Sequence, residues 1–254
     1  MTVPSLARGF TLTELAVVLA IIGVLLGGLL YTLLAQLDQR SWSDTEQRLD
    51  GAREAVLGFA TVNGRLPCPA RADSLADEVR TATGECRDGG GETYYSGLLP
   101  ARAIGYQPVD AQGYAVDAWG NRLRYAVAKT ITGCAVASPA LPHFTHAANL
   151  KSNGITCQPG DLLVCKSAAG ASAASCGPAG NVLTNQNVVV AIVWSPGKSP
   201  SAGGADESAN LNGDAVFISR PPSPGGAGGP FDDMLAWIPI GTFYGRLIAA
   251  GVLP

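Results

Sequence analysis

One apolar segment near the start of the chain constrains it more than any other feature. From Leu15 to Ala35 there are 21 residues without a charge. A helix of that length, rising ~1.5 Å per residue, can cross the hydrocarbon core of a bilayer, which is about 30 Å thick. Arg8 precedes the segment, and cationic residues favour the cytoplasmic side of a membrane. We therefore expect a single-pass anchor over residues 10–35, with its amino terminus in the cytoplasm.

Three interpretations of this segment compete. A cleaved secretory signal needs small residues before its cleavage site, but Leu33 stands at the critical third position before a cut after Ala35. A plain anchor explains the length, yet it gives no reason for Glu14, a carboxylate just inside the front edge that costs insertion energy. The third interpretation, a helix that assembles with other copies, accounts for the acid.

The stretch RGFTLTELAVVLAIIGVL resembles the class III signal of type IV pilins and type II secretion pseudopilins. The resemblance implies that a prepilin peptidase cuts between Gly9 and Phe10, so that residues 1–9 form a cytoplasmic leader. It also implies that Phe10 becomes the N-methylated amino terminus. In a filament, the Glu14 carboxylate of one subunit would pair with the Phe10 amine of its neighbour and so set the register of the two helices. Each charge alone would be unfavourable in a low-dielectric bundle of helices, so the two favour pairing.

Glycines inside the segment have two interpretations. Gly23 and Gly27, with Gly28, have the small-xxx-small spacing that lets membrane helices approach closely. Glycine is also simply common in membrane helices. Many major pilins have a proline in this stretch, whereas this chain has none between Phe10 and Pro67.

After Ala35 the pattern becomes amphipathic. Apolar residues recur at helical spacing among charged ones, at Trp42, Leu49, Ala52, Val56 and Phe59. This spacing predicts that the helix continues over residues 36–64 as the spine of a globular head. Asn63-Gly64 followed by Pro67 indicates its end.

The remaining residues, 65–254, predict a head of α+β class: a small antiparallel β-sheet packed on the long helix. The stretch DAWGNRLRY resembles the motif that follows the spine helix in major pseudopilins, where the aromatic residue and Asn brace the first hairpin. The pattern indicates strands at 122–128, 187–195, 214–220 and 234–238, a helix at 240–250, and loops at 71–91, 196–213 and 221–230. Residues 129–186 are expected to form a disulfide-stapled insertion with short strands.

Six cysteines all follow the apolar segment, which favours disulfides formed in an oxidising compartment such as the periplasm. No CxxC pair is present, which disfavours a zinc ribbon. Six cysteines allow 15 pairings. Local loop closure favours Cys68–Cys86, Cys134–Cys157 and Cys165–Cys176, the first most firmly.

Little in the sequence indicates catalysis or a cofactor. SPGKS lacks the upstream glycine of a P-loop, and no GxSxG motif occurs. The net charge of −3 gives no support to nucleic-acid binding. His143 and His146 are expected to be loop histidines rather than metal ligands.

An acidic stretch, ADESANLNGD, offers oxygen donors of the kind that calcium prefers. Its spacing does not match an EF-hand, and solvated acidic turns are the alternative. Glu207 belongs to the same stretch, and Asp232 and Asp233 follow it in FDD. Major pseudopilins often carry calcium in a late loop of the head. The calcium ligands implied here are Asp206, Asn210, Asn212 and Asp214.

Together these patterns favour a minor pilin or pseudopilin-like subunit, a structural protein rather than an enzyme. Its expected partners are other pilins or pseudopilins, the prepilin peptidase, the inner-membrane assembly platform and membrane lipid. The alternative is a binding module at a filament tip that recognises a surface, DNA or a secreted substrate. A third hypothesis, a tethered periplasmic enzyme, lacks a catalytic constellation. The sequence does not distinguish type II secretion from a type IV pilus or DNA uptake.

Overall fold

The computed structural model describes residues 11–201 and 203–253, apart from the side chains of residues 28–35 and 88. The predicted cleavage junction, Gly9–Phe10, lies outside the described residues. The chain divides into two compact units, Met1–Ser43 and Asp44–Pro254. We refer to the second unit as the head.

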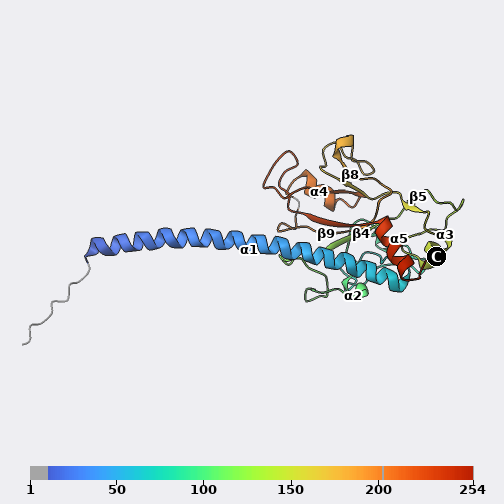
Figure 1. The fold of residues 1–254 in the computed structure, drawn as a ribbon, viewed down its shortest axis with the longest axis horizontal. Helices are drawn as coiled ribbons and strands as arrows, with labels where there is room; N and C mark the ends of the chain where they lie inside the picture. Colours follow the sequence, from blue (N-terminus) through green and yellow to red (C-terminus); the bar gives the residue numbers. More distant parts are fainter. Residues whose placement is uncertain (1–10, 202, 254) are drawn as a thin grey trace, which may run out of the picture. The chain divides into compact units, whose positions relative to one another are not determined.

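One continuous helix, α1 (Leu12–Asn63), contributes to both units (Figure 1). It ends where the sequence predicted: Gly64 has φ +67°, and its N–H donates to the carbonyl oxygen of Ala60 at 2.8 Å. A glycine meets the left-handed conformation of such a helix end without steric cost. Counting described residues only, none of the helices combines the length and the apolar character of a membrane span.

Within the head, α1 buries one stripe of side chains. The predicted positions Leu49, Ala52 and Val56 are buried. Phe59 is only half-buried, and the Arg65 guanidinium carbon lies 5.0 Å from its ring centroid. The buried stripe also includes Leu57 and Ala60, each one position after a predicted residue, Val56 and Phe59. Trp42 belongs to the first unit.

The main sheet has four antiparallel strands in the order β11-β9-β4-β3. Its bounds are β3 (Gly97–Leu98), β4 (Arg124–Val127), β9 (Val189–Ser195) and β11 (Met234–Pro239). All seven residues of β9 are buried, as expected for a central strand without polar alternation. The helix α5 (Ile240–Ala249) follows β11 directly, as predicted.

A second sheet, in the order β10-β7-β8, lies on one face of the main sheet (Figure 1). It consists of β7 (Leu163–Cys165), β8 (Val182–Thr184) and β10 (Val216–Ile218). The expectation of a wholly antiparallel head is wrong here, since β10 and β7 run parallel. A long crossover through β8 and β9 separates these two strands, and parallel pairing requires such a crossover. The ring centroids of Trp194 and Phe217 lie 5.0 Å apart between the two sheets.

The prediction of a loop at 196–213 is also partly wrong, because this stretch contains the helix α4 (Ala205–Leu211). Its first turn carries Asp206 and Glu207, which suit the positive end of a helix dipole. The loop predicted at 71–91 ends in a short hairpin of β1 (Arg87–Asp88) and β2 (Gly91–Glu92).

The other elements are short: the helices α2 (Ala101–Ile104) and α3 (Ala147–Asn153), a 3₁₀ turn η1 (Ala179–Asn181), and the strands β5 (Ile131–Thr132) and β6 (Gln158–Pro159).

Three disulfides staple the head: Cys68–Cys86, Cys134–Cys157 and Cys165–Cys176. They are the pairs that local loop closure favoured. Two of them lie in residues 129–186, where the expected short strands are present together with α3.

Both histidines lie outside the helices and strands, as expected: His146 is the N-cap of α3, and His143 precedes it in an irregular segment. The sequence did not indicate that His143 is fully buried. Asn153 Nδ2 lies 3.1 Å from His143 Nδ1, and His143 Nε2 lies 3.0 Å from Tyr244 Oη. Because Tyr244 Oη donates to the carbonyl oxygen of Cys157, it accepts from His143 Nε2–H. Burial lowers the pKa of His143 to about 4, so the ring is neutral.

Candidate functional site

The start of α1 is organised by the acid that the sequence analysis singled out. Glu14 Oε2 accepts from the backbone N–H of Thr11 at 2.9 Å, and the Glu14 N–H donates to Thr11 Oγ1 at 3.2 Å. These reciprocal bonds form a capping box, which satisfies two of the free N–H groups at a helix start. Glu14 thus has a local structural role that the sequence analysis missed, although the T-x-x-E spacing signals it.

The apolar side chains of the first turns of α1 have no cover from the described part of the chain. From Leu12 to Leu26 their exposed fraction ranges from 44% at Ile22 to 86% at Leu12. Apolar residues occur on all sides of this stretch, which is typical of helices that are surrounded by lipid or by other helices. Added Cβ atoms at Gly23 and Gly27 would meet nothing within 4 Å, so these glycines leave shallow notches on the exposed surface. The side chains of residues 28–35 lie outside the description, and so do the surroundings of Gly28.

Residues 5–30 match the protein-family model described as the prokaryotic N-terminal methylation motif. The chain carries the type IV pilin signal. The matched residues of this signal include Gly9, Phe10, Glu14, Gly23 and Gly27. No match was found among curated proteins or among solved structures.

The DAWGN turn connects the spine to the sheet. The buried carboxylate of Asp117 accepts from the N–H groups of Trp119 at 2.9 Å and Asn121 at 2.8 Å, and from Ser195 Oγ at 2.6 Å. The Asp117 carbonyl oxygen accepts from Arg48 Nη1 of α1 at 2.6 Å. Asn121 Nδ2 donates to the Gly197 carbonyl oxygen at 2.7 Å, so the asparagine links this turn to the segment that follows β9. Asp117, which the motif did not single out, makes more of these contacts than the asparagine.

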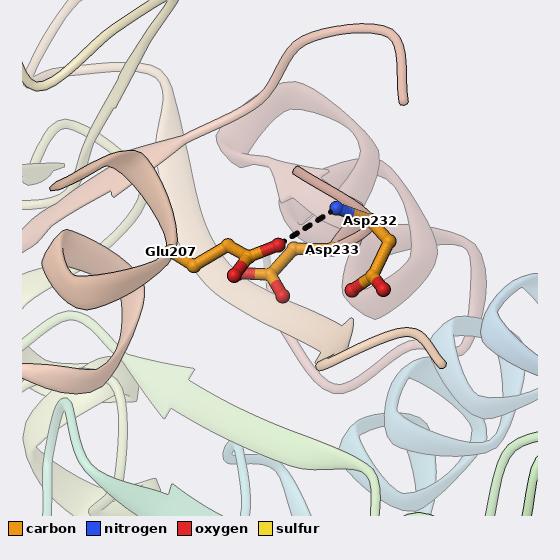
Figure 2. Close-up of side chains that lie close together, drawn as sticks. All are labelled: Glu207, Asp232 and Asp233. Carbon is orange, nitrogen blue, oxygen red and sulfur yellow. Dashed lines mark hydrogen bonds between the residues drawn. The ribbon is translucent and has the colours of Figure 1, made fainter. Parts of the chain in front are cut away.

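A second group of side chains gathers carboxylates inside the head. Glu207, Asp232 and Asp233 each place an oxygen within 4.8 Å of the others (Figure 2). The Asp232 N–H donates to Glu207 Oε1 at 3.0 Å, and Asn210 Nδ2 donates to Asp233 Oδ2 at 2.7 Å. Asp232 Oδ1 is buried, and no described group bonds to it.

Burial and the two neighbouring carboxylates raise the pKa of Asp233 to about 7, against the lowering effect of the Asn210 hydrogen bond. Near neutral pH the cluster therefore holds a proton on Asp233 part of the time. Three carboxylates this close together favour an added positive charge, which a proton or a cation supplies.

The four residues implied as calcium ligands do not form a cluster of their own. Asp206 accepts from Arg220 Nε at 2.7 Å and from the Ala168 N–H at 2.7 Å. Asn210 bonds to Asp233, and Asn212 Nδ2 donates to Asp214 Oδ2 at 2.7 Å. The acidic stretch and the FDD segment do meet, but through Glu207, Asp232 and Asp233. Helix α4 causes this difference, because it turns Asp206 and Glu207 toward different partners.

The pKa of Asp233 gives a prediction for stability. The contribution of Asp233 to the free energy of unfolding should fall as pH rises from about 4 to about 7, because the folded state holds a proton that the unfolded state has released. Asp233→Asn keeps an acceptor for Asn210 but cannot titrate at this position. The free energy of unfolding of the variant, relative to that of wild type, should therefore increase as pH rises from about 4 to about 7. The shift of about 3 pKa units corresponds to at most about 4 kcal/mol at pH 8.

Chemical denaturation of both proteins at pH 4.5, 6 and 8 measures this difference. The lowered pKa of His143 makes the free energy of unfolding rise with pH, but both proteins contain His143, so its contribution cancels in the comparison. A constant difference between the two proteins would contradict the prediction. If millimolar calcium raises the melting temperature of wild type at pH 8 but not that of Asp233→Asn, the positive charge is a bound cation.

Proposed function

We propose that this chain is a minor pilin or pseudopilin-like structural subunit, assembled through its amino-terminal helix into a type II secretion or type IV pilus filament. The observation that carries the proposal is the methylation motif at residues 5–30. The exposed apolar surface of α1 from Leu12 to Leu26 supports it, since that surface needs partners. The same motif supports processing by a prepilin peptidase and assembly with neighbouring pilins. The inner-membrane assembly platform is a further proposed partner.

The proposed location is the bacterial inner membrane, with the leader in the cytoplasm and the head in the periplasm before assembly. The 21 uncharged residues from Leu15 to Ala35 support an anchor of this length. Three disulfides support an oxidising compartment for the head. The head accounts for most of the chain, and a bulky head suits a tip or initiating position better than a repeated shaft position.

A binding role at a filament tip is the second candidate. A surface hollow of about 360 Å³ favours it, because residues of the insertion line one wall and α4 lines the other. Ala168, Ala171 and Ser172 come from the loop closed by Cys165–Cys176, and Ser208 and Ala209 come from α4. Loss of binding without loss of assembly, after this loop is changed, distinguishes the candidate from a purely structural role.

Calcium binding by the head stays a proposal. The donors that support it are now Glu207, Asp232 and Asp233 rather than the four residues implied by the resemblance.

Processing tests the proposed function directly. Gly9→Ala is expected to leave a precursor that keeps residues 1–9, because the substitution removes the glycine that the peptidase recognises before the cleaved bond. Gly27→Ala, which lies in the helix and meets no neighbouring atom, is the matched control and should be processed normally. Intact mass and amino-terminal sequencing measure both. A normally shortened Gly9→Ala protein, or a wild-type amino terminus at a position other than Phe10, would overturn the proposal.

A further inference from the structure

A strained turn holds a leucine at the surface of the head. The Asp77 N–H donates to the carbonyl oxygen of Ser74 at 3.1 Å, which closes a four-residue turn. Its central residues, Leu75 and Ala76, have φ angles of +52° and +59°. Two consecutive positive φ angles are typical of a type I′ turn, which is dominated by Asn, Asp and Gly because other side chains are strained there. A leucine at this position is locally unfavourable.

Hydrogen bonds around the turn keep it in this conformation. Ser74 Oγ donates to the Asp77 carbonyl oxygen at 2.8 Å. The Ala76 carbonyl oxygen accepts from the Arg102 N–H at 3.0 Å, which ties the turn to α2. Ala76 is fully buried, whereas the Leu75 side chain is 66% exposed. The fold therefore holds an aliphatic side chain outward at a conformational cost, and strain of this kind gathers at functional sites.

A hollow of about 460 Å³ lies beside Leu75. Its wall includes Arg102, Tyr106 and Val109. The Arg102 side chain is exposed, and none of the ion pairs among the described residues includes it. An exposed aliphatic side chain, a hollow and a cation without a counter-charge thus adjoin one another.

We propose that this surface, formed by Leu75, Arg102 and the hollow between them, docks a segment of a neighbouring filament subunit. The segment should present an aliphatic side chain next to a carboxylate, because the first would cover Leu75 and the second would neutralise Arg102. The partner's identity as a filament subunit rests on the proposed function.

Stability is the first test. Leu75→Asn places a residue that tolerates positive φ in the turn and removes the exposed apolar surface. The melting temperature of the head should rise, by about 2–4 °C, while docking is weakened. Leu75→Gly should do the same, and Val62→Ala, at an aliphatic side chain that is 84% exposed elsewhere on the head, is the control for docking. A lower melting temperature in both Leu75 variants would overturn the argument from strain.

Docking is the second test, carried out with the full chain in its own cells. A photo-crosslinking amino acid at Gln112, which lines the hollow and is exposed, should capture a subunit segment with an acidic residue beside an aliphatic one. Capture should drop at least fivefold in Leu75→Asn and in Arg102→Glu, but not in Lys151→Glu. Changing the captured acid to arginine should restore capture by Arg102→Glu.

Capture that is unchanged in both variants, capture of a protein that is not a filament subunit, or failure of the charge exchange would overturn the inference. The amino terminus of the same samples separates this result from the proposed function. A chain that is cut between Gly9 and Phe10 but gives no cross-link from Gln112 overturns only the docking surface. A chain with another amino terminus overturns the proposed function itself.

Discussion

Glu14→Ala is expected to be processed normally and to enter filaments at least about 100-fold less efficiently than wild type. In a bundle of apolar helices the Phe10 amine of the next subunit would lose its counter-charge, and an unpaired charge in such surroundings costs several kcal/mol. Each 1.4 kcal/mol is a tenfold change in an equilibrium constant, so a loss of about 3 kcal/mol in the free energy of assembly is enough for a 100-fold effect. Sheared filaments, compared by immunoblot with the processed subunit left in the membrane, measure the effect.

The capping box requires a control, because Glu14 also stabilises the start of α1 through Thr11. Glu14→Gln keeps an acceptor for the Thr11 N–H but has no charge, so it separates the two roles. We expect Glu14→Gln to assemble as poorly as Glu14→Ala or Glu14→Val. Assembly at the wild-type level in Glu14→Gln would show that capping matters and that the ion pair does not.

Asp117→Ala is expected to destabilise the head by about 3 kcal/mol or more, because the variant leaves buried donors without an acceptor. The N–H groups of Trp119 and Asn121 and the hydroxyl of Ser195 all donate to this carboxylate. For a domain of this size, the loss corresponds to a fall of about 6–12 °C in the melting temperature. Thermal unfolding followed by circular dichroism under oxidising conditions measures it.

Asp117→Asn is the matched variant. Its side-chain oxygen still accepts from the backbone, and its amide donates to Ser195 Oγ, so we expect a loss well below that of Asp117→Ala. Similar losses in the two variants would mean that the charge, and not the pattern of hydrogen bonds, holds the turn. A loss below 1 kcal/mol in Asp117→Ala would contradict the assigned role of the turn as the link between α1 and β9.

Local signals in the sequence were enough for the elements that the main core requires. Asn63-Gly64 indicated the end of α1, and the β-branched run of β9 indicated a buried central strand. The final strand and helix followed from a short apolar run and a helical pattern, and the cysteine spacings favoured the three disulfides. In each case neighbouring residues in the sequence carry the physical cause.

The errors lie where distant segments meet. The sequence has no local mark of the parallel pairing of β7 and β10, because a crossover brings them together. His143 is a buried hydrogen-bonding residue only because Asn153 and Tyr244 approach it from α3 and α5. The carboxylate cluster depends on α4, a short helix in a stretch dominated by turn formers, and the FDD segment reaches it from the other end of a Gly/Pro-rich loop.

The strand order of the main sheet governs when the head can form. The strand β9 pairs with β4 on one side and with β11 on the other, and β11 ends at Pro239. The central strand β9 therefore has one unpaired edge until residue 239 has been synthesised. Pairing between strands that are far apart in the sequence requires long loops to close, and the entropy cost of closing them slows folding. Until β11 pairs, one edge of the apolar strand at residues 189–195 has free N–H and C=O groups, to which a strand of another chain can bond.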